Sequence, residues 1–193
     1  STNERADQSL RRLVSAVFDP REQFVFVVSP SDIVRIWDIT KYEEVGEFRG
    51  HTGAINAIAL APSGQYLLSA SSDSTARLWK VSTQTLIKTL EGHTGPLWRA
   101  AFSHDGKKIV TASIISKARV WSVESGKPVS ILDGHESRVS FVEFDPTDRQ
   151  IVTASWDETA RIWDGESGEL RRVLKRHEGD RKGHEGEVFS AVF

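Results

Sequence analysis

The chain is a succession of short apolar runs, separated by clusters of Ser, Thr, Asp, Gly and Pro that recur at intervals of about 8–12 residues. Several runs alternate apolar and polar side chains, as residues 33–39 (IVRIWDI) do around Arg35. A period of two is typical of a half-buried strand. No stretch keeps the period of an amphipathic helix. The pattern therefore predicts an all-β fold with a helix content close to nil.

The predicted strands fall into four groups of four. Each group resembles the next in length, in apolar pattern and in the turn residues between its strands. The predicted strands are 13–18, 24–28, 33–39 and 44–50; then 54–60, 66–71, 76–81 and 85–90; then 97–102, 108–113, 118–123 and 128–132; and last 138–144, 150–155, 160–165 and 169–174.

Two residue types repeat through these groups at a fixed interval of 42 residues. A fixed period near 40 residues is typical of repeat architectures. Each four-stranded sheet has two apolar faces to cover, so it must stack against similar sheets, as the blades of a propeller do. The spaced residues are His51, His93, His135 and His177, together with Trp37, Trp79, Trp121 and Trp163.

These spaced residues stand in short motifs. A Gly-His pair opens three of the groups, at 50–51, 92–93 and 134–135. Trp-Asp or a variant of it ends the third predicted strand of all four, at 37–38, 79–80, 121–122 and 163–164. The combination resembles the WD40-repeat family over roughly residues 10–193. The resemblance implies WD40-type β-propeller blades, each a four-stranded antiparallel sheet.

On this resemblance the chain divides into a flexible N-terminal tail, four blades, an inserted loop and a final strand. That strand is an extra inner strand or a partial fifth repeat, or it lies across the first unit, because its sequence SAVF (190–193) repeats residues 15–18. The expected bounds are 1–9 for the tail, 10–49, 50–91, 92–133 and 134–176 for the blades, 177–183 for the loop and 184–193 for the last segment.

The resemblance also implies a hydrogen-bonded chain inside each blade. In the family, an Asp in a tight turn holds the His, the His bonds to a Ser or Thr hydroxyl, and the hydroxyl bonds to the Trp indole N–H. Each group supplies a donor or acceptor that its neighbour lacks. The third unit lacks the acid because Ile115 stands there, and the first keeps only Trp37. The implied members are His51, Ser69, Asp73 and Trp79; His93, Thr111 and Trp121; and His135, Thr153, Asp157 and Trp163.

His, Ser and Asp are also the residue types of nucleophilic triads. Here the set recurs with the repeat, includes a Trp, and places its hydroxyl inside an apolar strand, so a structural role is favoured. The repeated histidines lie 42 residues apart, without HxH or HExxH spacing. We therefore predict no enzyme activity, no metal site and no cofactor.

Composition further narrows the possible binding partners, metal sites and cellular location. The 193 residues carry a net charge of −2, which predicts neither nucleic-acid binding nor attraction to an anionic membrane. The absence of cysteine excludes disulfides and thiolate metal sites. No signal peptide and no apolar run near the roughly 18 residues of a membrane span are found, so a cytoplasmic location is favoured. Position 1 is not Met, so we expect a processed or trimmed start.

With no chemistry predicted, function is expected to lie on a surface. WD40 propellers bind partners on the face that carries the turns between the second and third strands and the starts of the inner strands. Large side chains that break the repeat at these positions are the expected anchors, since aromatic residues and Arg dominate interface energies. The alternative is that Trp98 and Trp156 only pack between adjacent blades. The candidate partner-binding residues are Trp98, Ile114, Arg138, Trp156 and Phe189.

Four blades are too few for a ring of this family, in which seven or eight are usual. Open blade faces are apolar and drive association. We therefore expect a half-propeller that closes as a homodimer into an eight-bladed ring, and a non-enzymatic scaffold for protein–protein interaction. The alternative is a trimmed fragment of a longer propeller, or an engineered repeat protein, with no activity beyond assembly.

Overall fold

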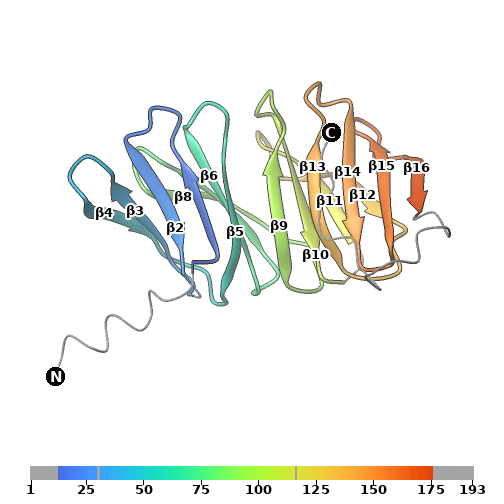
Figure 1. Cartoon of the computed structure of the whole chain (residues 1–193), viewed down its shortest axis with the longest axis horizontal. Helices are drawn as coiled ribbons and strands as arrows, with labels where there is room; N and C mark the ends of the chain where they lie inside the picture. Colours follow the sequence, from blue (N-terminus) through green and yellow to red (C-terminus); the bar gives the residue numbers. More distant parts are fainter. Residues whose placement is uncertain (1–12, 30, 116, 176–193) are drawn as a thin grey trace, which may run out of the picture.

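The computed structural model describes residues 13–29, 31–115 and 117–175 (Figure 1). These residues form sixteen β-strands in four separate four-stranded antiparallel sheets, and they contain no helix. The all-β prediction is confirmed. The expected tail 1–9, loop 177–183 and final segment 184–193, with Phe189, lie outside the described residues.

Each sheet is one blade, and its strands follow chain order from the inner to the outer edge. Blade 1 contains β1 (Ser15–Phe18), β2 (Phe24–Val28), β3 (Val34–Asp38) and β4 (Glu43–Phe48). Blade 2 contains β5 (Ile55–Leu60), β6 (Tyr66–Ser71), β7 (Ala76–Lys80) and β8 (Thr85–Leu90). Blade 3 contains β9 (Leu97–Phe102), β10 (Lys108–Ser113), β11 (Lys117–Ser122) and β12 (Pro128–Asp133). Blade 4 contains β13 (Val139–Phe144), β14 (Gln150–Ser155), β15 (Thr159–Asp164) and β16 (Leu170–Lys175).

Most strands begin and end within a residue or two of the predicted positions, because turn residues bound them closely. In the first turn of blade 1, the Asp19 carboxylate accepts hydrogen bonds from the backbone amides of Gln23 and Phe24, both at 2.7 Å. The first strand begins at Ser15 rather than at residue 13. Even so, the amide of Val14 still donates to the carbonyl of Val28 at 2.8 Å, so the pairing continues one residue beyond β1.

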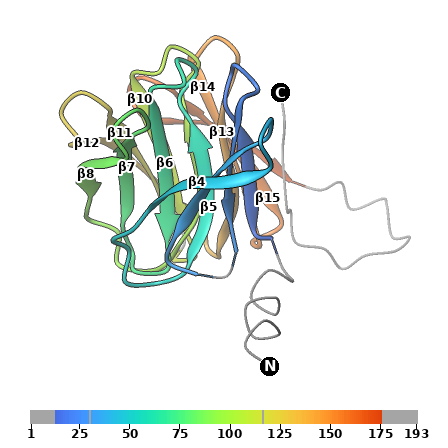
Figure 2. The same cartoon turned by 90° about the vertical axis from the view of Figure 1, so that its left-hand side faces the viewer.

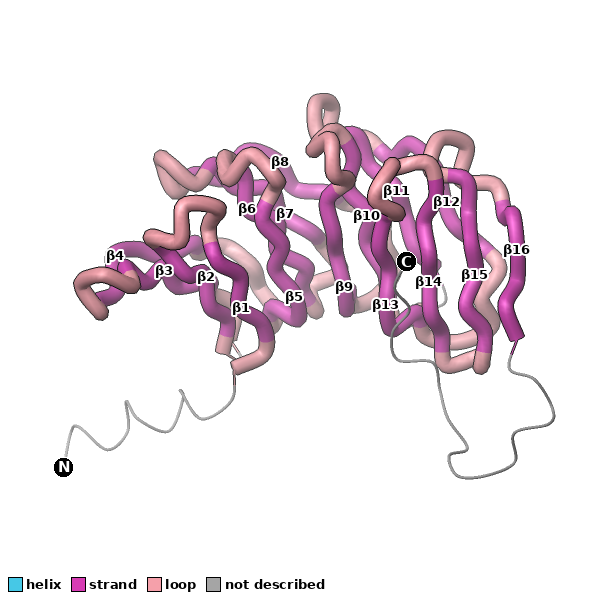
Figure 3. The backbone as a smooth tube through the Cα atoms, turned by 45° about the horizontal axis from the view of Figure 1, so that its top comes forward, coloured by secondary structure: helices cyan, strands magenta, loops and turns pink. Residues whose placement is uncertain are grey.

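The blades stack face to face, and the inner strands β1, β5, β9 and β13 lie side by side (Figure 3). Alternation along each strand sends neighbouring side chains to opposite faces. In blade 2, Leu67 packs into the cluster shared with blade 1, and Leu68 packs into the cluster shared with blade 3. A third cluster joins blades 3 and 4. The hydrophobic core is therefore a series of layers between blades.

Blade 1 stands at one end of this stack (Figure 2). Its Trp37 is half-buried, whereas the equivalent Trp79, Trp121 and Trp163 are only 3%, 1% and 1% exposed. The later tryptophans are covered by the blade that precedes them in the stack, and in the described structure no blade precedes blade 1. The Trp37 face is thus a partly open apolar surface.

Candidate functional site

A chain of three hydrogen bonds crosses the interior of blade 2. The Trp79 indole N–H donates to the Ser69 hydroxyl at 2.9 Å, the hydroxyl lies 2.8 Å from His51 Nε2, and His51 Nδ1 lies 2.7 Å from Asp73 Oδ2. The carboxylate can only accept, so His51 donates from Nδ1 and accepts the Ser69 proton at Nε2. His51 is thus the neutral Nδ1–H tautomer.

The charges of this pair agree with that assignment. Burial lowers the pKa of His51 and outweighs the opposing effect of Asp73, so the ring stays neutral. Burial raises the pKa of Asp73, but hydrogen bonds from Thr75, His51 and the Thr52 amide outweigh it and lower this pKa to about 2. The Thr75 amide and hydroxyl bind Asp73 Oδ1 at 2.9 and 2.7 Å. Asp73 therefore ties the turn to the His.

Blade 4 repeats the same arrangement. Trp163 Nε1 lies 2.8 Å from the Thr153 hydroxyl, which lies 2.7 Å from His135 Nε2. His135 Nδ1 lies 2.7 Å from Asp157 Oδ2, and Thr159 binds the other carboxylate oxygen. Burial raises the pKa of Asp157, but these hydrogen bonds more than offset that effect and keep it well below its usual value.

Blade 3 has the chain without its acid. Trp121 Nε1 and His93 Nε2 each lie 2.8 Å from the Thr111 hydroxyl. Ile115 is 48% exposed, and its side chain fills the space that a Cβ on Gly95 would need. Burial, and then the charge of Arg119, lower the pKa of His93 to about 4, because no carboxylate opposes them.

In the two complete networks the central hydroxyl is buried and already hydrogen-bonded. The Ser69 and Thr153 side chains are buried at 0% exposure, and each hydroxyl is already bound by an indole and an imidazole. A substrate cannot reach them without opening the blade. Among the described residues, no three His, Asp or Glu side chains are grouped as metal ligands.

Steric constraints explain why the Gly-His pair begins with glycine. Gly50 and Gly134 adopt φ angles of +148° and +149°, which other residues rarely adopt. A Cβ at either position would also collide with the guanidinium group of Arg77 or Arg161. Glycine is therefore required where the outer strand of one blade leads into the next blade.

Comparison with known families agrees with this geometry. The sequence model described as WD domain, G-beta repeat matches residues 42–80, 84–122 and 126–164, more than half of the chain. The chain belongs to the WD40-repeat family. Each matched segment begins just before the outer strand of one blade and ends at the last residue of the third strand of the next, so the family repeat joins two neighbouring sheets. A comparison with curated proteins finds none that matches. Within the described residues, no helix has the length and apolar character needed to cross a bilayer.

In this WD40 protein, three of the predicted partner-binding residues meet at the boundary of blades 3 and 4. The Arg138 guanidinium carbon lies 4.2 Å from the centre of the Trp156 ring and 5.5 Å from that of Trp98. Both distances are within the range of cation–π attraction. Trp98 is 44% exposed, and Arg138 and Trp156 are half-buried.

Backbone pairing explains why these positions lie together. The Trp156 amide donates to the carbonyl of Arg138, and the Ile114 amide donates to that of Pro96, both at 3.0 Å. Each bond joins the turn after the second strand to the residue just before the inner strand. We call Trp98, Ile114, Arg138 and Trp156 the tryptophan surface. The corresponding place in blade 2 is polar.

In blade 2, Asn56 Nδ2 donates to the Ser72 hydroxyl at 2.9 Å and to the Leu97 carbonyl of blade 3 at 2.7 Å.

Sequence reasoning missed one neighbour of the tryptophan surface. Exposed Arg99 on β9 lies over the Phe141 ring of β13, at 5.2 Å from its centre. The sequence does carry a signal for this residue. Arg99 is charged, whereas the residues 42 positions before and after it, Ala57 and Phe141, are apolar.

Proposed function

We propose that this WD40 protein is a non-enzymatic scaffold that binds a protein partner through the tryptophan surface. The observation that supports this most is the placement of the Arg138 guanidinium over the rings of both Trp156 and Trp98, with Trp98 left 44% exposed. Aromatic residues and Arg that are held rigidly at a surface are typical interface anchors. They lose little conformational freedom when a partner binds.

The chemistry of the surface suggests an acidic partner segment. A guanidinium that stacks on an indole ring keeps its N–H edges to bind a planar carboxylate. No carboxylate of the described residues lies within ion-pair distance of the Arg138 side chain. Exposed Arg99 adds a second positive charge nearby. We therefore propose a partner that presents Asp or Glu beside an apolar side chain.

Selection from a random peptide library tests this proposal. The wild-type protein should enrich peptides with an acidic residue next to an apolar one, and Arg138→Ala and Trp98→Ala should lose that enrichment. Tyr42→Ala is the matched control, because Tyr42 is 85% exposed in a turn of blade 1. Enrichment that is unchanged in Arg138→Ala would contradict the proposal. A large loss of Tm in Trp98→Ala and Trp156→Ala would indicate that the indoles serve to pack blade 3 against blade 4.

We also propose that two copies associate through the Trp37 face into an eight-bladed ring. The half-exposed state of Trp37, compared with its buried equivalents, supports this. Light scattering should give about 43 kDa, twice the 21.5 kDa of the chain. Trp37→Glu should reduce that mass to the monomer value. A wild-type monomer would instead favour a trimmed fragment of a longer propeller, and stable oligomers that select no peptide would favour an engineered repeat protein.

A further inference from the structure

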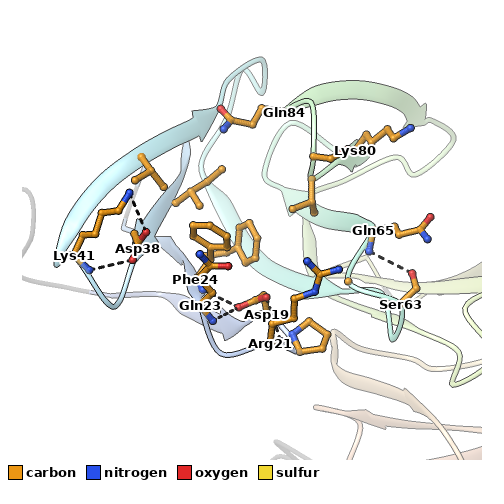
Figure 4. Close-up of a pocket in the computed structure, with 17 residues that line it drawn as sticks. Asp19, Arg21, Gln23, Phe24, Asp38, Lys41, Ser63, Gln65, Lys80 and Gln84 are labelled. Atoms are coloured by element: carbon orange, nitrogen blue, oxygen red, sulfur yellow. Dashed lines mark hydrogen bonds and ion pairs between the residues drawn. The ribbon is translucent and has the colours of Figure 1, made fainter.

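A cavity of about 730 Å³ opens between blades 1 and 2 (Figure 4). Its lining includes the apolar side chains of Phe24, Phe26, Ile36 and Val81, with Arg21 at the mouth. The volume is within the range of small-molecule sites, which is about 300–1,000 Å³. The tryptophan surface belongs to blades 3 and 4, so this cavity is a separate feature.

The seam between blades 1 and 2 lacks a lysine bridge that the seam between blades 3 and 4 makes. At the seam between blades 3 and 4, Lys108 Nζ reaches across to the Gly165 carbonyl at 2.8 Å and to the Glu166 carboxylate at 2.6 Å. The repeat places Phe24 at the position of Lys108 and Ser82 at that of Glu166. Phenylalanine cannot make such a bridge.

A second cross-blade bond is also missing at this seam. In blade 4, Asp148 accepts the backbone amides of His104 and Asp105 from blade 3, at 2.8 and 2.9 Å. The corresponding residues at the first seam are Gly64, which has no carboxylate, and Pro20, which has no N–H. Neither of these two bonds can therefore close the mouth between blades 1 and 2.

The charges around the mouth favour an anion. The carboxylates of the lining are already used: Asp19 accepts amides of its own turn, and Asp38 accepts the amide and hydroxyl of Thr40. Arg21 makes no ion pair with any described residue, and its guanidinium points into the gap between the blades (Figure 4). An unpaired guanidinium near the partly exposed ring of Phe24 is suited to a ligand with one carboxylate and one flat apolar body.

We propose that the cavity between blades 1 and 2 binds a small aromatic carboxylate, with its ring against Phe24 and Val81 and its carboxylate on Arg21. The cavity walls come from two blades, so a bound ligand also holds blade 1 against blade 2. Binding to the folded form alone stabilises the protein by mass action.

Ligand titration followed by NMR tests the proposal with 2-naphthoate as the probe and neutral 2-naphthamide as its analogue. The naphthoate should bind the wild-type protein about tenfold more tightly, as expected for one charge-assisted hydrogen-bond pair. Its chemical-shift changes should centre on Phe24 and Val81. Arg21→Gln should remove the preference and leave naphthamide binding unchanged. Arg149→Gln is the matched control, because Arg149 is exposed in the corresponding turn of blade 4.

A second variant tests the cavity rather than the charge. Phe24→Lys combined with Ser82→Glu introduces the residues that close the seam between blades 3 and 4, and it should abolish binding of both probes while the far-UV spectrum is retained. If neither probe binds the wild-type protein, no site exists there. Equal affinities for the two probes, or a preference that survives Arg21→Gln, would overturn the carboxylate assignment.

Discussion

Blades 3 and 4 adopt the same fold around two different hydrogen-bond networks. Blade 4 extends its Trp–Thr–His chain to Asp157, while blade 3 ends at His93 because Ile115 replaces the acid. The turn itself is the same: the amides of Ile115 and Asp157 donate to a preceding Ser hydroxyl at 3.2 and 3.1 Å. A serine therefore shapes the turn, and the aspartate adds a connection from the turn to the buried histidine.

The largest difference should appear when that connection is cut. Asp157→Ala leaves His135 Nδ1, the Glu136 amide and Thr159 without their acceptor. Buried donors that lose a charged partner are costly, so we expect a loss of about 3 kcal/mol in the free energy of unfolding. Ile115→Ala in blade 3 should cost less than about 1 kcal/mol, since the side chain is half exposed. Urea denaturation measures both, and hydrogen exchange should localise the first effect to blade 4. Equal losses would contradict a connecting role for the aspartate.

Acid should destabilise the protein through the buried histidines, and His93 of blade 3 allows the size of the effect to be estimated. Burial lowers the pKa of His93 to about 4, so the unfolded chain, near 6.5, takes up a proton before the folded protein does. The stability contributed by neutral His93 is complete above about pH 6.5 and is lost as the pH falls towards 4. We expect a decrease of about 2 kcal/mol between pH 7 and pH 5 from this residue.

Thermal unfolding between pH 7 and pH 5 measures the slope of stability against pH. His93→Gln should flatten that slope. His51 and His135 add to the slope in the same direction, since burial lowers the pKa of both. A stability that is constant from pH 7 to pH 5 would show that the histidines are not held neutral.

Blade 1 extends the comparison to a unit without any network. Val27 occupies the place of the buried hydroxyl there, and Trp37 is half-buried. Trp163→Phe removes the indole N–H from the Thr153 hydroxyl and should destabilise the protein by about 1.5 kcal/mol. Trp37→Phe removes no such bond and should cost less than about 0.5 kcal/mol. Chemical denaturation of both variants at a concentration where the protein is monomeric gives the difference. A greater loss in Trp37→Phe would point to an unrecognised partner for that indole.

How much of the fold and of the candidate sites could be predicted from the sequence depends on whether a contact lies within one repeat or joins two blades. Strand positions follow from local alternation and turn residues, and the network members follow from fixed offsets within one repeat, such as His51 to Asp73. Contacts between blades depend on pairs of side chains that no single repeat contains. Gln84, for example, fills the space above Gly46, whereas at the next seam Lys88 lies over Gly126.

Both candidate sites depend on such contacts between blades, which limits their prediction from the sequence. Trp98, Arg138 and Trp156 could be chosen individually as large residues that break the repeat, but their stacking order depends on rotamers from two blades. The cavity between blades 1 and 2 could not be predicted, because it depends on how two blades pack. The repeat aligns Phe24 with Lys108, but only the structure shows that Lys108 reaches across a seam and that a cavity opens beside Phe24.

The smallest expected effect comes from supplying blade 3 with the missing acid. Ile115→Asp combined with Lys117→Thr introduces the residue types that Asp157 and Thr159 provide in blade 4. The gain in stability should be only about 0.5–1 kcal/mol, because the new bonds are offset by the loss of Ile115 packing over Gly95. The pKa of His93 is the more sensitive measurement. A carboxylate at Nδ1 opposes burial, so this pKa should rise above its value of about 4. An NMR titration of the His93 ring measures the shift, with Ile114→Asp as the control, since it adds the same charge one residue earlier in the turn. If the double variant leaves the His93 pKa unchanged while the control raises it, residue 115 does not face the histidine, and the difference between blades 3 and 4 has another origin.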